Sequence, residues 1–281
     1  MTAFLRHARY VLTENRVTLA AFCLLLALVL LAVLGPWLTP YNPLLSNAAH
    51  KLEPPSRSHW FGTDQVGRDI LSRVIVATRL DLVISLSAVA LSFALGSAAG
   101  ACAGFFGGWT DRLISRVVDT IMAFPLFVLA MGIVAALGNT LANIVYATAI
   151  INVPFYARMA RAEVNVRRDA RFVEAARLAG NGPARILGVH LFPNCLPPMM
   201  VQASLNLGWA ILNAAALSFI GLGVRPPTAE WGIMVADGAA FIISGEWWVA
   251  FFPGLALMLA VLCFNLLGDG LRDLVDPRRR T

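Results

Sequence analysis

The segment Phe172-Val-Glu-Ala-Ala-Arg-Leu-Ala-Gly180 lies at the centre of residues 158–194, which form the longest basic segment of the chain. Long apolar runs precede and follow it, so the sequence predicts a loop between two membrane-spanning helices. Asp169 can cap a helix that starts near Ala170, and Gly180 can end that helix in a left-handed conformation. The small side chains of Ala175, Ala176 and Ala179 would let a partner approach the helix backbone closely. An ordered helix of this kind, held outside the bilayer, predicts a docking surface for another protein.

The composition places this loop in a polytopic membrane protein. The 281 residues are 58% hydrophobic and only 14% charged. The charges gather between uncharged runs, and about 20 apolar residues suffice for a helix that crosses a bilayer. The net charge of +6 comes from basic residues beside these runs, which indicates membrane topology rather than binding to nucleic acid.

The apolar runs predict an all-α protein with six transmembrane helices. We place the spans at about residues 17–34, between 81 and 111, in the two halves of 120–157 divided at Gly138-Asn139, at 198–222 and at 249–268. Residues 1–81 then form an N-terminal region with the first span, an external loop and an amphipathic surface helix that starts near Val66. Residues 82–281 form a core region of five spans. In the second span, glycines at four-residue steps predict close helix packing; they are Gly96, Gly100 and Gly104.

Basic residues predict the orientation of the chain. If both termini are cytoplasmic, 16 of the 22 lysines and arginines lie inside, including Arg6 and Arg9 near the N-terminus. Membrane proteins carry an excess of basic residues in cytoplasmic loops. The loop at residues 158–194 is therefore expected in the cytoplasm.

One face of the fifth span carries polar and aromatic side chains at steps of four, three and four residues. Amides are costly in lipid, so this face must meet protein or a water-filled path. Hydrogen bonding between helices and the lining of a translocation pathway are both open readings. The residues are Gln202, Asn206, Trp209 and Asn213.

Two further polar features also have alternative interpretations. Asp119 can form a structural ion pair with Arg112 or Arg116 in a short basic loop, or it can act in transport. The amphipathic segment after His59 can be an interfacial lead-in to the second span, which we favour, or a substrate site.

The sequence contains no catalytic, cofactor-binding or metal-binding motif. A P-loop is absent, and the single lysine, Lys51, lies in the proline-rich external loop. The chain therefore cannot bind ATP phosphates through a P-loop of its own. Neither a G-x-S-x-G nor an H-E-x-x-H motif is present. The cysteines and histidines lack metal-ligand spacing; they are Cys23, Cys102, Cys195, Cys263, His7, His50, His59 and His190.

The loop resembles a known motif. Glu174-Ala-Ala-x-x-x-Gly180, followed by His190-Leu-Phe-Pro-Asn194, is similar to the EAA loop of ABC importer permeases. The general pattern has an aliphatic residue at His190 and leucine at Phe192, but histidine is usual in the dipeptide, oligopeptide and nickel branch. Three other stretches resemble the second permease of that branch. They are Phe61-Gly-Thr-Asp-Gln-Val-Gly-Arg-Asp-Ile-Leu-Ser-Arg73, Ser218-Phe-Ile-Gly-Leu-Gly-Val-Arg-Pro-Pro-Thr-Ala-Glu-Trp-Gly232 and Phe264-Asn-Leu-Leu-Gly-Asp-Gly-Leu-Arg-Asp-Leu-Val-Asp-Pro277.

The resemblance implies a type I ABC importer permease fold in the bacterial inner membrane. The expected partners are a paralogous permease, two ATP-binding subunits, and a periplasmic or lipid-anchored solute-binding protein. The loop is expected to dock in a cleft of an ATPase and to move as a lever. The residues expected in this coupling contact are Glu174, Ala175, Ala176, Arg177, Ala179, Gly180 and Pro193.

The expected cargo is a short peptide or a similar small solute, because the relatives of this type carry dipeptides, oligopeptides, glutathione, D-amino-acid dipeptides, opines or nickel chelates. The alternative is a membrane scaffold or receptor that docks a cytoplasmic protein without moving solute. Co-purification with two P-loop subunits and substrate-stimulated ATP hydrolysis separate these two readings.

Overall fold

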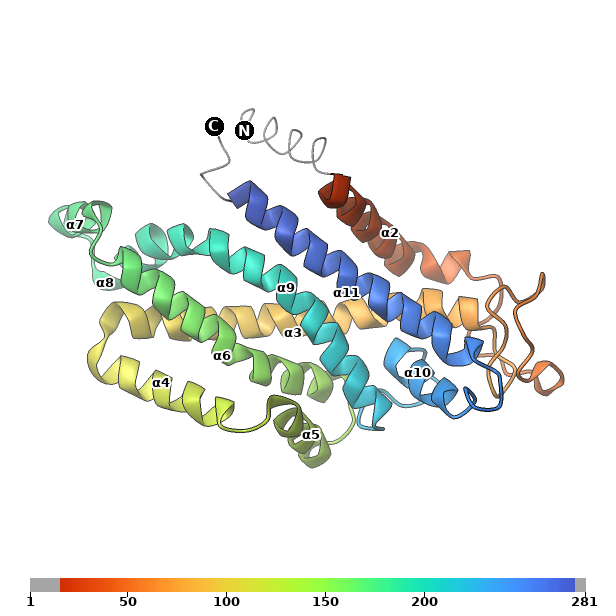
Figure 1. Cartoon of the computed structure of the whole chain (residues 1–281). Helices are drawn as coiled ribbons and strands as arrows, with labels where there is room; N and C mark the ends of the chain where they lie inside the picture. Colours follow the sequence, from red (N-terminus) through yellow and green to blue (C-terminus); the bar gives the residue numbers. More distant parts are fainter. Residues whose placement is uncertain (1–15, 276–281) are drawn as a thin grey trace.

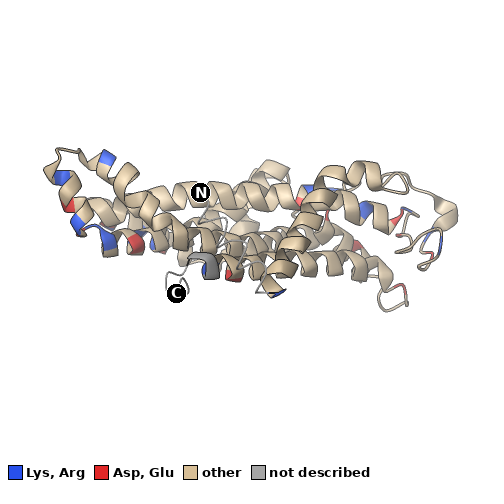
Figure 2. Ribbon diagram, turned by 90° about the horizontal axis from the view of Figure 1, so that it is seen from above, with Lys and Arg blue, Asp and Glu red and all other residues tan. Residues whose placement is uncertain are grey.

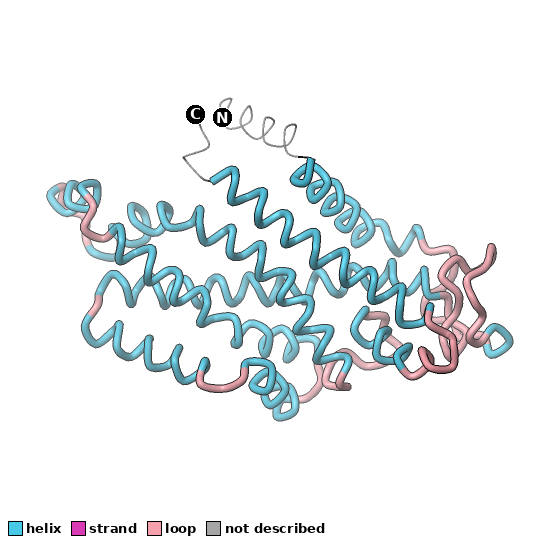
Figure 3. The backbone as a smooth tube through the Cα atoms, viewed as in Figure 1, coloured by secondary structure: helices cyan, strands magenta, loops and turns pink. Residues whose placement is uncertain are grey.

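A computed structural model describes residues 16–275 of the chain. Arg6, Arg9 and the motif end at Asp276-Pro277 lie outside this range. The described residues form helices and loops without a named strand (Figure 3), and one isolated bridge joins Thr63 to Asp69. The elements are α2 (Arg16–Leu38), η1 (Ala48–His50), α3 (Ile70–Phe106), α4 (Gly108–Met122), α5 (Leu126–Leu137), α6 (Leu141–Arg167), α7 (Arg171–Leu178), α8 (Pro183–Arg185), η2 (Ile186–Leu191), α9 (Phe192–Phe219), α10 (Trp231–Ala239) and α11 (Trp248–Val275).

The long helices α2, α3, α6, α9 and α11 lie along one common direction (Figure 1). Helix α7 stands at one end of this bundle, and the loop at residues 39–69 and helix α10 stand at the other. Lysine and arginine gather at the α7 end, with a second set at the opposite end (Figure 2). Two charged ends around a largely uncharged middle are the pattern expected of a membrane-spanning bundle.

The predicted count of six spans is not confirmed. Four helices are long and apolar enough to cross a membrane, namely α2, α3, the continuous stretch Pro183–Phe219 and α11. A fifth span is present if α4 and α5 count together, although the two are bent by 88°. Pro125 lies at this break because it cannot continue the α4 helix. Helix α6 has 27 residues, but Asn143, Asn152 and Arg158 lower its hydropathy.

Helix α3 differs from its prediction because it is one continuous helix of 37 residues. The surface helix expected from Val66 and the second span are therefore a single element that begins at Ile70. The Asp69 carboxylate caps it by accepting the Ser72 N–H at 2.8 Å. The boundary predicted after residue 81 falls inside α3, and α2 packs against both α3 and α11.

The α3–α6 contact is the most extensive helix pair in the described chain, and it confirms the glycine packing face. A Cβ atom at Gly100 would lie 2.0 Å from the Ala157 carbonyl oxygen. At Gly96 the corresponding distance to the Val153 oxygen is 2.6 Å. Small residues let the two backbones approach this closely.

The segment between α9 and α11 contains the buried helix α10. The Glu230 carboxylate caps α10 by accepting the N–H groups of Gly232 and Ile233 at 2.8 and 2.9 Å. Burial raises the pKa of Glu230, and these backbone N–H groups oppose that rise. The Trp231 backbone N–H donates to Asp81 of α3 at 3.2 Å. Helix α10 is thereby held against the bundle.

Candidate coupling and translocation site

Helix α7 begins and ends within one residue of the predicted positions. Its N-terminal cap is wrong, because Ala170 occupies the cap position and the Asp169 carboxylate instead lies 3.4 Å from Arg168. Its C-terminal cap is as predicted. Gly180 has φ +77°, and the Asn181 N–H donates to the Ala176 carbonyl at 3.2 Å, which is the Schellman arrangement.

The two faces of α7 have different chemistry. Val173 and Ala176 are buried against the bundle, so Ala176 does not contribute to the low exposed surface that we predicted. Arg171, Ala175 and Leu178 form the opposite, exposed ridge at spacings of four and three residues. Leu178 is 91% exposed. Together with Phe172, which is 42% exposed, Leu178 adds apolar surface to the exposed side of α7.

Sequence reasoning missed Leu178 and the exposed Phe172. Helical periodicity could have indicated both residues, because the period that buries Val173 places them on the exposed side of α7. The other residues predicted for coupling are exposed, namely Glu174, Ala175, Arg177, Ala179, Gly180 and Pro193. Within residues 16–275, no ion pair joins Glu174 to Arg177. Both charges therefore remain available to a partner.

The buried face of α7 belongs to a hydrophobic cluster that joins four elements. It contains side chains from the ends of α3 and α6, from α7 itself, and from the stretch that runs through η2 into α9. The buried members are Ala101, Ala160, Val164, Val173, Ala176, Ile186, Leu191, Cys195 and Met199. Helix α7 packs on η2, which continues into α9, and α6 contributes to the same close-packed cluster. We call this group the coupling cluster.

Ion pairs strengthen the same end of the bundle. Asp119 pairs with Arg158 of α6 at 2.7 Å, not with Arg112 or Arg116 as predicted. Those two arginines lie within helix α4 rather than in a loop. Asp111 of α4 accepts two hydrogen bonds from Arg161, at 2.5 and 2.7 Å. Bidentate geometry of this kind is the stronger form of an arginine–carboxylate contact, so α4 is tied to α6.

All four predicted pathway residues line one cavity of about 660 Å³. The structure adds two amides that sequence reasoning did not place with them, namely Asn152 of α6 and Asn265 of α11. The remaining wall is largely apolar and includes Pro125, Phe127 and Phe155. We call this space the amide cavity. Its size and its mixture of apolar walls with a few polar groups are typical of small-molecule sites.

Hydrogen bonds orient the amides. Gln202 Nε2 donates to Asn206 Oδ1 at 3.0 Å, and Asn213 Nδ2 donates to the Trp209 carbonyl at 2.9 Å. Asn206 Nδ2 is buried and makes no hydrogen bond of ordinary geometry in the described part of the chain, and the buried Tyr156 hydroxyl, which also lacks one, is the polar group that interacts with Asn206. Gln202 occupies the Asn206 oxygen, so Nδ2 is the group of this side chain without a well-formed hydrogen bond. A buried unpaired donor is costly unless a ligand or water satisfies it.

A second cavity of about 530 Å³ lies between the amide cavity and the end that carries α7. It shares Gln202 and Leu205 with the amide cavity, and it also includes Glu163, Arg167 and Arg272. Polar groups thus continue from the amide cavity toward the coupling end. Polar cavities inside a membrane bundle are the arrangement expected of a transport protein.

Two family models match the chain. Residues 93–281 match the model described as the binding-protein-dependent transport system inner membrane component. Residues 3–55 match the N-terminal TM domain of oligopeptide transport permease C. Because the first match covers more than half of the chain, the protein belongs to the family of binding-protein-dependent transport system inner membrane components.

Curated relatives agree with this family. The chain is 42% identical over 269 residues to a probable D,D-dipeptide transport system permease protein of Escherichia coli K12, which covers 96% of this chain and 90% of the relative. It is 43% identical over 276 residues to a dipeptide transport system permease protein of Alkalihalophilus pseudofirmus, with 98% and 90% covered. A glutathione transport system permease protein of Pectobacterium atrosepticum is 39% identical over 269 residues, with 95% and 89% covered.

The protein is therefore the transmembrane permease subunit of an ABC importer in the bacterial inner membrane, as the EAA resemblance implied. Permease subunits of this kind work with separate ATPase subunits and with a solute-binding protein. ATP hydrolysis belongs to those ATPase subunits, so the chain is a transport component rather than an enzyme. Membership of this family favours the permease over the scaffold that moves no solute.

Proposed function

We propose that the chain forms half of a translocation pathway for a short peptide and that α7 couples this pathway to an ATPase subunit. The proposal rests on the observation that the amide cavity and the coupling cluster are built from the same helices. Helices α6 and α9 line the amide cavity through Asn152 and Asn206, and the same helices enter the coupling cluster through Val164 and Met199. A movement of α7 therefore tilts the cavity walls.

The chemistry of the amide cavity supports a peptide as cargo. A peptide offers backbone carbonyl oxygens and N–H groups, and the amide side chains that line the cavity carry donors and acceptors that match them. No charged side chain lines the amide cavity within residues 16–275, so it favours a backbone over a bare ion. Relatives named for D,D-dipeptide, dipeptide and glutathione transport support the same class.

The proposed complex contains a paralogous permease, two ATPase subunits and a periplasmic or lipid-anchored binding protein. Both termini and α7 lie in the cytoplasm, as the distribution of basic residues indicates. The loop at residues 39–69, which lies at the end opposite α7, faces the binding protein. Residues 1–81 serve as an N-terminal region and residues 82–281 as the permease core, and the two matched family ranges support this division.

Reconstitution tests the function. The chain is co-expressed with the permease, ATPases and binding protein encoded beside it, and the complex is placed in proteoliposomes. We expect a di- or tripeptide library to contain members that stimulate ATP hydrolysis and enter the vesicles. Transport of a non-peptide solute by the same complex, with no response to any peptide, would contradict the cargo assignment and leave the permease role intact.

Asn206→Leu tests the pathway. The variant removes the Asn206 amide from the cavity wall, including the acceptor for Gln202, while keeping a side chain of similar length. Loss of one hydrogen bond to a buried cargo costs about 1.5 kcal/mol, so we expect peptide uptake to fall roughly tenfold with ATPase binding unchanged. Leu212→Ala, on the same helix but outside the amide cavity, is the control and should transport normally. Equal uptake by the two variants would place the pathway elsewhere.

Glu174→Lys tests the charge on the docking surface. Glu174 is exposed on α7, so reversal of its charge leaves the fold intact. We expect weaker ATPase binding and uncoupled transport, because a like charge facing a complementary cleft costs several kcal/mol. Co-purification and uptake are the measurements. Arg171→Glu, at another exposed position of α7, shows whether ATPase binding also depends on a positive charge there. Normal uptake by Glu174→Lys would reject the coupling role of this residue.

A further inference from the structure

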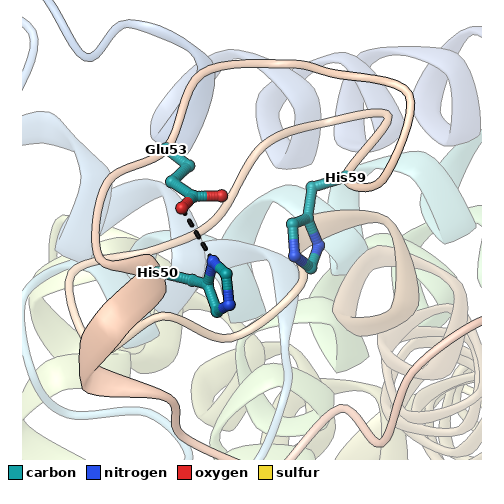
Figure 4. Close-up of side chains that lie close together, drawn as sticks. All are labelled: His50, Glu53 and His59. Atoms are coloured by element: carbon teal, nitrogen blue, oxygen red, sulfur yellow. Dashed lines mark hydrogen bonds and ion pairs between the residues drawn. The ribbon is translucent and has the colours of Figure 1, made fainter.

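His50, Glu53 and His59 come together in the external loop, although they are spread along a proline-rich segment (Figure 4). One ligand atom from each residue lies within 4.8 Å of the other two. His50 Nδ1 is 2.7 Å from Glu53 Oε1. The spacing in the sequence gave no reason to expect a metal site here, because the loop and not a helix brings the three side chains together.

The histidine at the back of the group is held by a buried carboxylate. His59 Nδ1 lies 2.9 Å from Asp69 Oδ1, and the Asp69 side chain is 1% exposed. With Nδ1 engaged by Asp69, His59 offers Nε2 to a metal. A metal-binding histidine almost always donates its other ring nitrogen to a carboxylate or carbonyl in this way. This contact distinguishes the group from an accidental pair of surface charges.

The backbone that carries the three side chains is cross-linked by further hydrogen bonds. Thr63 Oγ1 donates to the His50 carbonyl at 2.5 Å and accepts the Glu53 N–H at 2.9 Å. The His59 N–H donates to Ser56 Oγ at 3.1 Å, and the Tyr41 ring lies 4.7 Å from the His59 ring. The ligands are therefore positioned before any ion arrives, which lowers the cost of binding.

We propose that His50, Glu53 and His59 bind one divalent cation of the Zn²⁺ class. Two imidazoles and one carboxylate supply three ligands and leave the fourth tetrahedral position to water. The present distances accommodate metal–ligand bonds of about 2.0–2.2 Å after small side-chain rotations. Imidazole ligands favour Zn²⁺, Cu²⁺ or Ni²⁺ over Mg²⁺ or Ca²⁺.

The site acts as a clamp on the external loop. The loop is already attached to α11, because the Phe61 and Phe252 rings stack at 4.0 Å and Trp248 Nε1 donates to the Thr63 carbonyl at 3.3 Å. A cation bound by these ligands would link η1 to the segment at His59 and so cross-link the loop. None of its three ligands lines the amide cavity, so the ion belongs to the loop and not to the cargo route.

Zinc binding to the intact complex tests this proposal. The complex is purified through a tag without histidine, and Zn²⁺ alone is titrated in competition with a chromophoric chelator. We expect one Zn²⁺ to bind per copy of this chain and the thermal unfolding midpoint of the complex to rise with the Zn²⁺ concentration. His50→Ala and Glu53→Gln should each weaken binding at least about tenfold and remove the thermal shift. Both residues are partly exposed, so the variants keep the fold.

His190→Ala is the matched control, since His190 lies in η2 at the opposite end of the bundle. It should bind Zn²⁺ as the unaltered complex does. Absence of stoichiometric Zn²⁺ binding would overturn the proposal, and so would binding that His50→Ala and Glu53→Gln leave unchanged. In either case His50 and Glu53 form only an exposed ion pair, which contributes about 1 kcal/mol or less.

Discussion

Replacing Leu178 with aspartate is expected to abolish transport while the permease remains folded in the membrane. Leu178 is 91% exposed and contributes nothing to the coupling cluster, so the fold does not depend on it. In the proposed complex the same side chain enters a cleft of the ATPase and loses its water. A carboxylate there is an unpaired charge in a desolvated contact, and central interface residues commonly contribute about 2–4 kcal/mol. ATPase binding should fall at least about thirtyfold.

The measurement is co-purification of the ATPase together with peptide-stimulated ATP hydrolysis. Ile243→Asp is a matched control because Ile243 is 98% exposed and follows α10, near the opposite end of the bundle. Both variants place one carboxylate on an exposed aliphatic position, but only Leu178→Asp alters the docking surface. Equal ATPase binding by the two variants would show that α7 does not form the contact.

The fold class follows from the sequence because membrane solvation acts on long stretches of residues. About 20 apolar residues are needed for each span, and α2, α3, α9 and α11 carry such runs. Local breaks were harder to predict. A separate surface helix was predicted before the second span because several charged residues lie within residues 66–81. In the structure Arg73 is buried and donates to the carbonyls of Pro43 and Pro227. A contact with a residue so distant in the sequence leaves no local pattern.

The candidate site also has a part that could be predicted from the sequence and a part that could not. The periodic amides of the fifth span identified one wall of the amide cavity, because all four lie on a single helix. Asn152 and Asn265 complete the wall from α6 and α11, and no spacing within one helix connects them to Asn206. Similarly, the EAA motif located α7, but Ala176 is buried because it joins a cluster with side chains of other elements, such as Val164 and Ile186. Residues that meet through tertiary packing are beyond a pattern read along the chain.

Gly100→Ala is expected to destabilise the bundle more than any other single methyl group added to a helix glycine. The new Cβ would lie 2.0 Å from the Ala157 carbonyl oxygen and 2.7 Å from its carbon. These atoms belong to the α6 backbone, so no side-chain rotation relieves the clash and the whole helix must shift. Overpacking of a close contact usually costs 1–3 kcal/mol, and we expect about 3 kcal/mol here.

Gly132→Ala in α5 separates this steric effect from the general effect of glycine replacement. A Cβ at Gly132 meets nothing within 4 Å, and alanine favours a helix by about 1 kcal/mol over glycine. Gly132→Ala should therefore keep or raise the unfolding midpoint in detergent, whereas Gly100→Ala should lower it. Any folded Gly100→Ala protein should also lose coupling, because α6 carries both Asn152 and the coupling-cluster residue Val164. Equal midpoints for the two variants would mean that α3 and α6 do not pack at backbone contact, and the route from α7 to the amide cavity would then lose its rigid support.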